Sequence, residues 1–257
     1  NNGKNVELDT LIKKVIERSV LICSQTNGAF DITVAPIVNQ WGFGPKRMQK
    51  KVSTLADSPN LKGCNKLSLY NDSLIMIDNV NLDLNGIAQG FSVDYVSDFL
   101  LKQNIVNFMV EIGGEVRCSG SNLGKPWKIA IDKPKEYGDR EFAYILQVND
   151  LSISTSGSYR NFYYTSDSSK ITHHMNPIEM KPAFNNLISA TVLSKYCMDA
   201  DAYSTACMAT GLEGSKKFLT EHEISACLMY LENQDTVSYF SGSFLSFLHS
   251  NNGSAPQ

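Results

Sequence analysis

Long apolar runs are missing from this sequence. Nowhere do about 18 or more apolar residues follow one another, as a membrane-spanning helix requires. An excess of positive charge is also missing, since the formal net charge is −3 and the pI is near 5.8. The sequence therefore predicts no membrane-spanning helix and no nucleic-acid partner. One small group of cations, which we interpret as a solvated turn, comprises Lys46, Arg47, Lys50 and Lys51.

Several common catalytic and metal-binding motifs are absent as well. There is no P-loop, no GxGxxG fingerprint and no G-x-S-x-G elbow, so a hydrolase triad has little support. The 6 cysteines form neither a CxxC nor a zinc-type cluster with histidine. Most have apolar neighbours, as in VLICSQ and ISACLMY, so we expect buried free thiols without disulfides.

The first residues, NNGKNVELDT, contain neither a signal peptide nor a lipid-attachment cysteine. They also start without Met, so this absence has little bearing on the cell compartment.

The composition that remains is that of a globular protein. Of the 257 residues, 42% are hydrophobic and 19% are charged, which is enough to build a substantial core. No low-complexity linker and no internal repeat divides the chain. Helical and strand-like segments alternate, so we predict one compact α/β domain over residues 1–257.

The hydrophobic spacing predicts helices at several places. One spans 7–26 and ends at Asn27-Gly28, and a second spans 87–103 with Ile87, Phe91, Tyr95 and Phe99 facing inward. Two more are expected at 199–211 and 215–223. Residues 29–47 are too rich in Gly and Pro for a long regular element. Strands are expected at 67–71, 73–79 and 81–85, which form a meander, and at 107–120, 126–134, 143–164, 186–194, 224–232 and 236–242.

Four segments could carry chemistry, and each also has a structural interpretation. In LDLNGIAQGFSVD, the turn at Asn85-Gly86 leads into a helix whose N-terminus suits a phosphate, or it is an ordinary connection. The paired glycines of EIGGEVRCSG indicate either a close backbone approach or a β-bulge. STSGSYRNFYY, with Arg160, could bind an anion or form turns, and THHMNP could supply a general base or packing histidines.

The stretch DADAYSTACMATG places a carboxylate and a hydroxyl on one face of an expected helix. Asp201 and Thr205 are four residues apart, so their side chains share that face. Carboxylate, hydroxyl and carbonyl oxygens together favour Mg²⁺ or Ca²⁺ over zinc. The alternative is that Asp201 caps the helix N-terminus and Thr205 is part of the packing.

Taken in order, these segments resemble the ApbE family, the FAD:protein FMN transferases. GAFDITVAPIVNQWGFGP, LDLNGIAQGFSVD, EIGGEVRCSG, PWKIAIDKP, STSGSYRNF, THHMNP and DADAYSTACMATG each match a family block in the family's order. The resemblance covers roughly residues 8–245. It implies transfer of the FMN portion of FAD to a Thr or Ser hydroxyl of an acceptor protein, with release of AMP and dependence on Mg²⁺.

The resemblance also implies roles for individual residues. Asp201, Thr205 and the backbone carbonyl of Gly86 are expected to hold the metal, and His173 is expected to be the catalytic base. Flavin contacts are expected from Ala29, Phe30, Asp31, Asp83 and Gln89. Metal chemistry fits the reaction, because attack on a pyrophosphate requires charge neutralisation on the phosphate oxygens.

The chain departs from the family pattern at a few positions. Asn176 replaces an acid, Glu179-Met180 replace Thr-Gly, and Gln89 replaces a lysine. The family's early Met-Gly-Thr strand has no counterpart here, so we expect part of the flavin pocket to lie outside this chain. We expect these departures to affect the turnover rate and the flavin affinity more than the family assignment.

Two other functions compete with the transferase. A Mg²⁺-dependent FAD pyrophosphatase would use the same metal and FAD sites, with water in place of the acceptor hydroxyl. A non-catalytic flavin-binding protein would keep the fold without the chemistry. The resemblance further implies a location outside the cytoplasm and attachment to the membrane through a lipid anchor. It also implies that the acceptor protein is a subunit of a redox complex.

Overall fold

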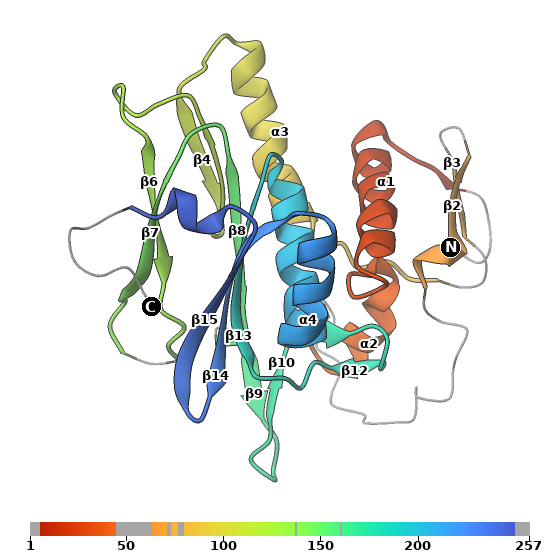
Figure 1. Ribbon diagram of the computed structural model, residues 1–257. Coiled ribbons are helices and arrows are strands. Elements are labelled where there is room, and N and C mark those ends of the chain that lie inside the picture. Colours follow the sequence, from red (N-terminus) through yellow and green to blue (C-terminus); the bar gives the residue numbers. More distant parts are fainter. Residues whose placement is uncertain are drawn as a thin grey trace.

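A six-stranded antiparallel sheet lies at the centre of the structure, with helices on one face and a hairpin on the other (Figure 1). The structure is a computed structural model that describes residues 6–44, 63–70, 73–76, 80–136, 138–159 and 161–249. The strand order is β15-β14-β13-β8-β5-β4. These strands are β4 (Phe108–Ile112), β5 (Glu115–Ser119), β8 (Ser152–Gly157), β13 (Leu187–Ser194), β14 (Ser225–Glu232) and β15 (Asp235–Ser241).

The central strand β13 is buried on both faces because a separate core covers each. Ala190 and Val192 pack with the helices, whereas Leu193 packs with the hairpin of β6 (Trp127–Asp132) and β7 (Phe142–Val148). The register against β14 shifts between Leu187 and Ser189. Successive side chains of a strand point to opposite faces, so such a shift changes which residues face each core.

Helices α1 (Thr10–Gln25), α3 (Ala88–Lys102) and α4 (Cys197–Glu221) confirm the predicted helices. The two helices expected around Gly211 are one element with a kink there, where the backbone has φ 75° and ψ −174°. Within 29–47, two short helices form instead of a plain loop, η1 (Ile32–Val34) and α2 (Ala35–Gln40). The predicted cationic turn at 46–51 and Arg160 lie outside the described residues.

Smaller sheets surround this centre, and one of them corrects the predicted meander. β2 (Leu67–Tyr70) pairs with β3 (Ser73–Met76) as expected, but residues 81–85 are not a strand. The third strand of that sheet is β1 (Val6–Glu7), which pairs with β3. The 81–85 segment instead lies against the start of η1, where the amide of Asp83 donates to the Ile32 carbonyl at 2.7 Å. The remaining pairs are β9 (Phe162–Tyr164) with β10 (Lys170–Thr172), and β11 (Met175–Asn176) with β12 (Lys181–Pro182).

The N-terminus of α4 is built on α3. A Cβ on Gly90 would lie 2.4 Å from the carbonyl oxygen of Cys197, so only glycine permits this approach. One turn later, the buried carboxylate of Asp94 accepts from the amides of Cys197 and Met198, both at 3.0 Å. These amides have no partner within their own helix, and Asp94 therefore acts as a cap supplied from another helix. Arg117 of β5 pairs with Asp94 at 2.9 Å.

The same helix also holds α1 in place. The Arg18 guanidinium donates to both carboxylate oxygens of Asp199, from Nε and from an Nη, at 2.6 Å each. The Tyr203 hydroxyl donates to Gln25 at 2.6 Å. Asp199 lies in the first turn of α4, where a negative charge is favoured by the helix dipole.

The predicted inward face of α3 is wrong for most of its length. Ile87 is fully buried, but Tyr95 and Phe99 are more than half exposed. The buried face consists of Gly90, Val93, Asp94 and Ser97. Small side chains let α4 pack closely, so the helix turns its bulky apolar residues away from this contact.

The expectation of free cysteines holds for most of them but is wrong for one pair. Cys23 of α1 and Cys64 at the start of η3 (Cys64–Lys66) form a disulfide, although 41 residues separate them. No sequence spacing encodes such a pair, because the fold alone brings it together. The thiols of Cys118, Cys197, Cys207 and Cys227 are free and buried. Burial raises the pKa of Cys118, Cys207 and Cys227 to about 12, so these thiols are inert.

We expect Asp94→Ala to lower the free energy of unfolding by about 3–5 kcal/mol, because it leaves two helix amides without their acceptor and removes the buried partner of the largely buried Arg117 guanidinium. Asp98→Ala is the matched control. Asp98 also contacts Arg117, at 3.2 Å, but its side chain is 38% exposed, so we expect a loss below about 1 kcal/mol. Denaturant unfolding followed by circular dichroism measures both. Equal losses in the two variants would contradict the capping role.

Candidate active site

A cavity of about 450 Å³ opens where α4, the turn before α3, the loop after α1 and strand β8 meet. Its volume suits a small-molecule ligand. Every residue that the sequence predicts for the site lines this cavity, namely Ala29, Phe30, Asp31, Asp83, Gly86, Gln89, His173, Asp201 and Thr205. The fold thus brings together residues from both halves of the chain.

Asp201 and Thr205 face the cavity from α4. The Asp201 carboxylate is 4% exposed and accepts from the amide of Gly90 at 2.9 Å. Because α4 begins at Cys197, Asp201 lies past its first turn and does not cap it, so the capping interpretation is wrong. Gly86 packs directly on Thr205, and a Cβ there would lie 3.0 Å from the threonine hydroxyl oxygen.

The turn that carries Gly86 is shaped by Asp83. Its carboxylate accepts from the amide of Asn85 at 2.8 Å, which is a local side-chain turn of the Asx type. This bond places Gly86 against α4 just before α3 begins at Ala88.

The ionisable side chains that line the cavity are acids and histidines. Four carboxylates line it, and among its described lining residues none is Lys or Arg; the acids are Asp31, Asp83, Glu115 and Asp201. Burial raises the pKa of Asp201 to about 8, with a smaller contribution from Glu115, while the Gly90 amide opposes the shift. A cation bound beside Asp201 would favour its ionised form.

The donor set fits a magnesium ion. Carboxylate, hydroxyl and backbone carbonyl oxygens are the ligands that Mg²⁺ prefers. Asp201, Thr205 and Gly86 line the same cavity and offer one of each kind, and Gly86 packs on Thr205. Mg²⁺ usually completes its coordination with water and substrate phosphates, so three protein groups suffice.

His173 faces the cavity in a form suited to act as a base. Its Nδ1 lies 3.0 Å from the Asn161 carbonyl oxygen, which only accepts, so Nδ1 carries the proton and Nε2 is left basic. Burial lowers the pKa of His173, so the imidazole is neutral at neutral pH. Its ring centroid lies 6.3 Å from that of Phe43 and 4.0 Å from that of His174.

Sequence reasoning missed Glu115 and His174 as residues of the cavity. The paired glycines before Glu115 are a two-residue hairpin turn between β4 and β5, with φ 63° at Gly113 and 111° at Gly114, and not a bulge within a strand. Gln89 donates to the Ile112 carbonyl at 3.0 Å, beside this turn. The Gly-Gly pair followed by a charged residue is the sequence signal that could have identified Glu115, because a hairpin turn directs the next side chain to a defined face of the sheet.

The departures from the family pattern keep the local turn intact. Asn176 accepts from the amides of Ile178 and Glu179, at 3.0 and 3.1 Å, with its side-chain oxygen. An aspartate would accept the same bonds. Met180 has φ 57°, a left-handed conformation that glycine adopts without cost. Its side chain packs on the small core of Ile37, Val38 and Met175.

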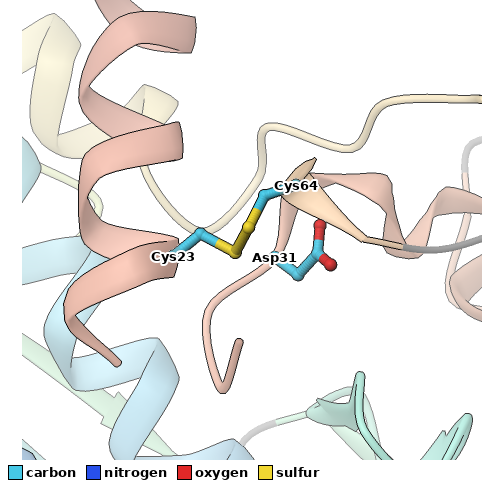
Figure 2. A group of neighbouring side chains, drawn as sticks. All are labelled: Cys23, Asp31 and Cys64. Carbon is cyan, nitrogen blue, oxygen red and sulfur yellow. A yellow bond between two sulfur atoms is a disulfide. The ribbon is translucent and has the colours of Figure 1, made fainter. Parts of the chain in front are cut away.

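A second group of potential ligands borders the cavity. Cys23, Asp31 and Cys64 have ligand atoms within 4.8 Å of one another (Figure 2). Both sulfurs belong to the disulfide, so neither offers the thiolate that binds a metal. In this oxidised form the group is not a metal site.

Comparison with known proteins points to one family. A family model described as "ApbE family" matches residues 1–229. A curated relative from Vibrio cholerae, named FAD:protein FMN transferase, is 37% identical over 239 residues, which are 91% of this chain and 71% of that protein. The solved structure of the flavin transferase ApbE from Vibrio cholerae aligns with a TM-score of 0.84 at 34% identity, covering 96% of this chain and 80% of that one.

A second structure agrees. The apo flavinyl transferase ApbE of Pseudomonas stutzeri aligns with a TM-score of 0.86 at 29% identity and covers 97% of this chain and 78% of that one. These structures confirm the predicted α/β fold class.

The raised pKa of Asp201 predicts how the metal-free protein responds to pH. Between about pH 6.5 and 8 the folded state keeps a proton on Asp201 that the unfolded state, with a pKa near 3.9, has lost. Stability therefore falls as pH rises through this window, by at most about 1.4 kcal/mol per pH unit. We expect this in denaturant unfolding with a chelator present.

Asp201→Asn is the control for this prediction, because the amide cannot ionise. Its unfolding free energy should lack the Asp201 contribution to the slope. In the lower part of this window unfolded histidine, with a pKa near 6.5, is still losing its proton, so His173 and His174 add a slope of opposite sign. That slope is common to both proteins, so the difference between their slopes reports Asp201. Identical pH slopes for the two proteins would contradict the assignment.

Proposed function

The chain belongs to the ApbE family, and on this premise we propose that it transfers the FMN portion of FAD to a Thr or Ser hydroxyl of an acceptor protein and releases AMP. The curated relatives named FAD:protein FMN transferase support flavin transfer in general. The Mg²⁺ dependence, the acceptor hydroxyl and the release of AMP are the finer parts of the proposal.

One observation carries the proposal most directly. The oxygen set of Asp201, Thr205 and Gly86 and the neutral imidazole of His173 line the same cavity. A pyrophosphate and the ionised acids that line the cavity carry charge of the same sign, so a bound cation would favour its entry. The arrangement therefore supports a metal-dependent reaction on a phosphate ester.

The residues of this chain would divide the work as follows. Asp201, Thr205 and Gly86 would hold a Mg²⁺ ion, which would supply charge neutralisation on the pyrophosphate oxygens when bound. His173 Nε2 takes the proton of the acceptor hydroxyl, while the oxygen of that hydroxyl forms a bond to the FMN phosphorus. The bond from that phosphorus to the bridging oxygen breaks, and AMP leaves with that oxygen. The Asn161 carbonyl keeps the histidine in the reactive tautomer.

The flavin would be held by the loop after α1 and the turn before α3. Ala29, Phe30 and Asp31 line the cavity from the loop after α1, and Asp83 and Gln89 line it from the turn before α3 and the start of that helix. Gln89 lacks the charge of the lysine that the family commonly has there. Its side-chain amide donates to the Ile112 carbonyl beside the β4–β5 turn, and its side-chain oxygen can still accept a hydrogen bond.

The acceptor is proposed to be a redox-complex subunit outside the cytoplasm. The disulfide supports that compartment, because disulfides persist in oxidising environments. Among the described helices, none combines the length and apolar character needed to cross a bilayer. Membrane attachment through a lipid anchor stays a prediction. Recovery of the native protein from a cytoplasmic fraction, with Cys23 and Cys64 as free thiols, would contradict the proposed location.

We expect the protein, given FAD, Mg²⁺ and a threonine-bearing acceptor, to add the mass of FMN to the acceptor and release AMP in equal amount. His173→Ala should lower the transfer rate by roughly 10²–10⁴-fold, the usual contribution of a positioned base. Asp201→Ala should abolish the Mg²⁺-dependent reaction. Mass spectrometry of the acceptor and chromatography of AMP measure these outcomes.

His249→Ala is the matched control, because this histidine contacts Lys128 and does not line the cavity. It should leave transfer unchanged. Rapid release of AMP without an acceptor would show that the protein is instead a pyrophosphatase. An acceptor that gains no flavin from the wild-type protein would refute the transferase.

A further inference from the structure

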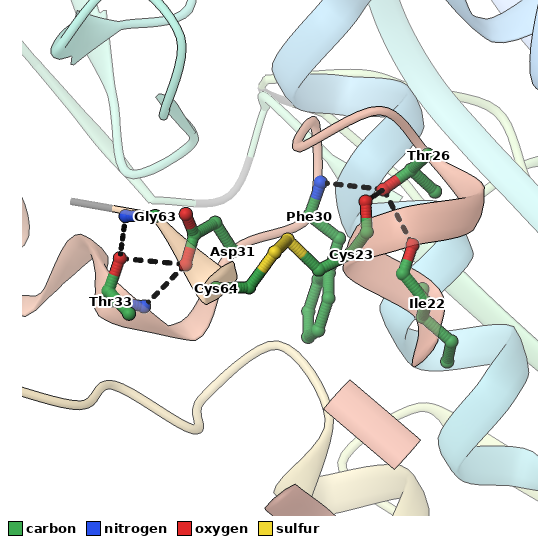
Figure 3. Close-up of a disulfide and its surroundings, with 8 residues drawn as sticks. All are labelled: Ile22, Cys23, Thr26, Phe30, Asp31, Thr33, Gly63 and Cys64. Atoms are coloured by element: carbon green, nitrogen blue, oxygen red, sulfur yellow. Dashed lines mark hydrogen bonds between the residues drawn. A yellow bond between two sulfur atoms is a disulfide. The ribbon is translucent and has the colours of Figure 1, made fainter. Parts of the chain in front are cut away.

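The disulfide joins the two segments that lie on either side of Asp31. Cys23 lies in the last turns of α1, directly before the loop that carries Ala29, Phe30 and Asp31. Cys64 begins η3, and its Cα lies 6.4 Å from that of Cys23. Figure 3 shows the sulfur bridge between the hydrogen bonds of Asp31 on one side and those of Thr26 on the other.

The segment at Cys64 holds the carboxylate of Asp31. The Gly63 amide donates to the Thr33 hydroxyl at 2.8 Å, and that hydroxyl donates to Asp31 Oδ1 at 2.8 Å. The Thr33 amide donates to the same oxygen at 2.8 Å. Burial raises the pKa of Asp31, while hydrogen bonds from the amides of Thr33, Cys64 and Gly63 and from the Thr33 hydroxyl oppose that rise.

The segment at Cys23 fixes the other end of the same loop. The Gly28 amide donates to the Cys23 carbonyl at 2.8 Å, and the Ala29 amide donates to the Thr26 carbonyl at 3.0 Å. The Thr26 hydroxyl accepts from the Phe30 amide at 3.1 Å and donates to the Ile22 carbonyl at 2.8 Å. The cavity loop is thus held between two segments that one covalent bond connects.

The disulfide holds Cys64 beside Asp31, two residues that lie far apart in sequence. Without it, the closing of a long loop is opposed by chain entropy, and the link between this segment and Asp31 rests on hydrogen bonds to Thr33 and Asp31. A carboxylate that loses its donors is free to change rotamer. The cavity wall at Asp31 would then cease to be preorganised for a ligand.

We propose that the Cys23–Cys64 disulfide is a positioning element of the flavin site, which holds Asp31 and the Ala29–Phe30 loop in the shape that binds FAD. The inference rests on the proposed function, since it takes FAD as the ligand of this cavity. It also makes FAD binding sensitive to redox state. An added dithiol gives up two electrons and two protons and closes to its own disulfide, while the Cys23–Cys64 bond opens to two thiols.

The test compares direct FAD binding by oxidised wild type, by wild type treated with dithiothreitol, and by Cys23→Ala/Cys64→Ala. Quenching of flavin fluorescence gives the Kd, with Mg²⁺ present and no acceptor. Loss of about one well-placed hydrogen bond corresponds to a Kd raised about fivefold or more in both disulfide-free forms. With acceptor added, KM for FAD should rise by the same factor and kcat should stay within about twofold.

Asp31→Ala separates positioning from general stability. If the disulfide acts through Asp31, opening it in this variant should raise the Kd little further, because coupled changes are not additive. Cys118→Ser is the matched control, since this free, buried thiol is remote from the bridge in sequence and should leave the response to dithiothreitol unchanged. Circular dichroism and thermal melting establish that each form is folded at the temperature of the measurement.

The outcomes distinguish the two proposals. Equal Kd values for the folded oxidised and reduced wild type would overturn the positioning role alone. Fully additive effects of Asp31→Ala and of opening the disulfide would do the same. If the oxidised protein binds no FAD, the proposed function fails and this inference with it. If it binds FAD with the expected redox dependence but labels no acceptor, the transferase fails and the positioning role stands.

Discussion

The close approach of α4 to α3 at Gly90 is the contact on which the site depends. The missing side chain lets the Cys197 carbonyl approach α3, and the amide of the same glycine donates to the Asp201 carboxylate. One turn along α3, Asp94 caps the two amides at the start of α4. Packing of two helices and placement of the proposed metal ligand are therefore one arrangement. A larger residue at position 90 would displace both.

The acids of this region serve two different purposes, and their partners distinguish them. Asp94 and Asp199 each face an arginine, so their charges are compensated within the protein. Asp201 has no arginine partner among the described residues, and burial raises its pKa although the Gly90 amide donates to it. Burying such a carboxylate destabilises the apo protein. A cost of that kind is common at functional sites, where a ligand supplies the compensating charge.

Local backbone geometry accommodates two of the residues that depart from the family pattern. Asn176 accepts the backbone bonds that an acid would accept, and Met180 takes a left-handed conformation while its side chain joins a small core. Near the cavity, the disulfide adds a covalent link between α1 and η3. These features change how the walls of the cavity are held more than which groups line it.

Sequence patterns and the family resemblance were enough to predict the main helices, most strands and nine of the residues that line the cavity. Hydrophobic periodicity, turn residues and ordered family blocks are local signals, and they survive in the folded chain. Only the tertiary structure decided which face of α3 is buried, that Asp94 and not Asp201 caps α4, that Glu115 joins the cavity, and that Cys23 meets Cys64. Each of these depends on contacts between segments far apart in the chain, where close packing and charge compensation override local preference.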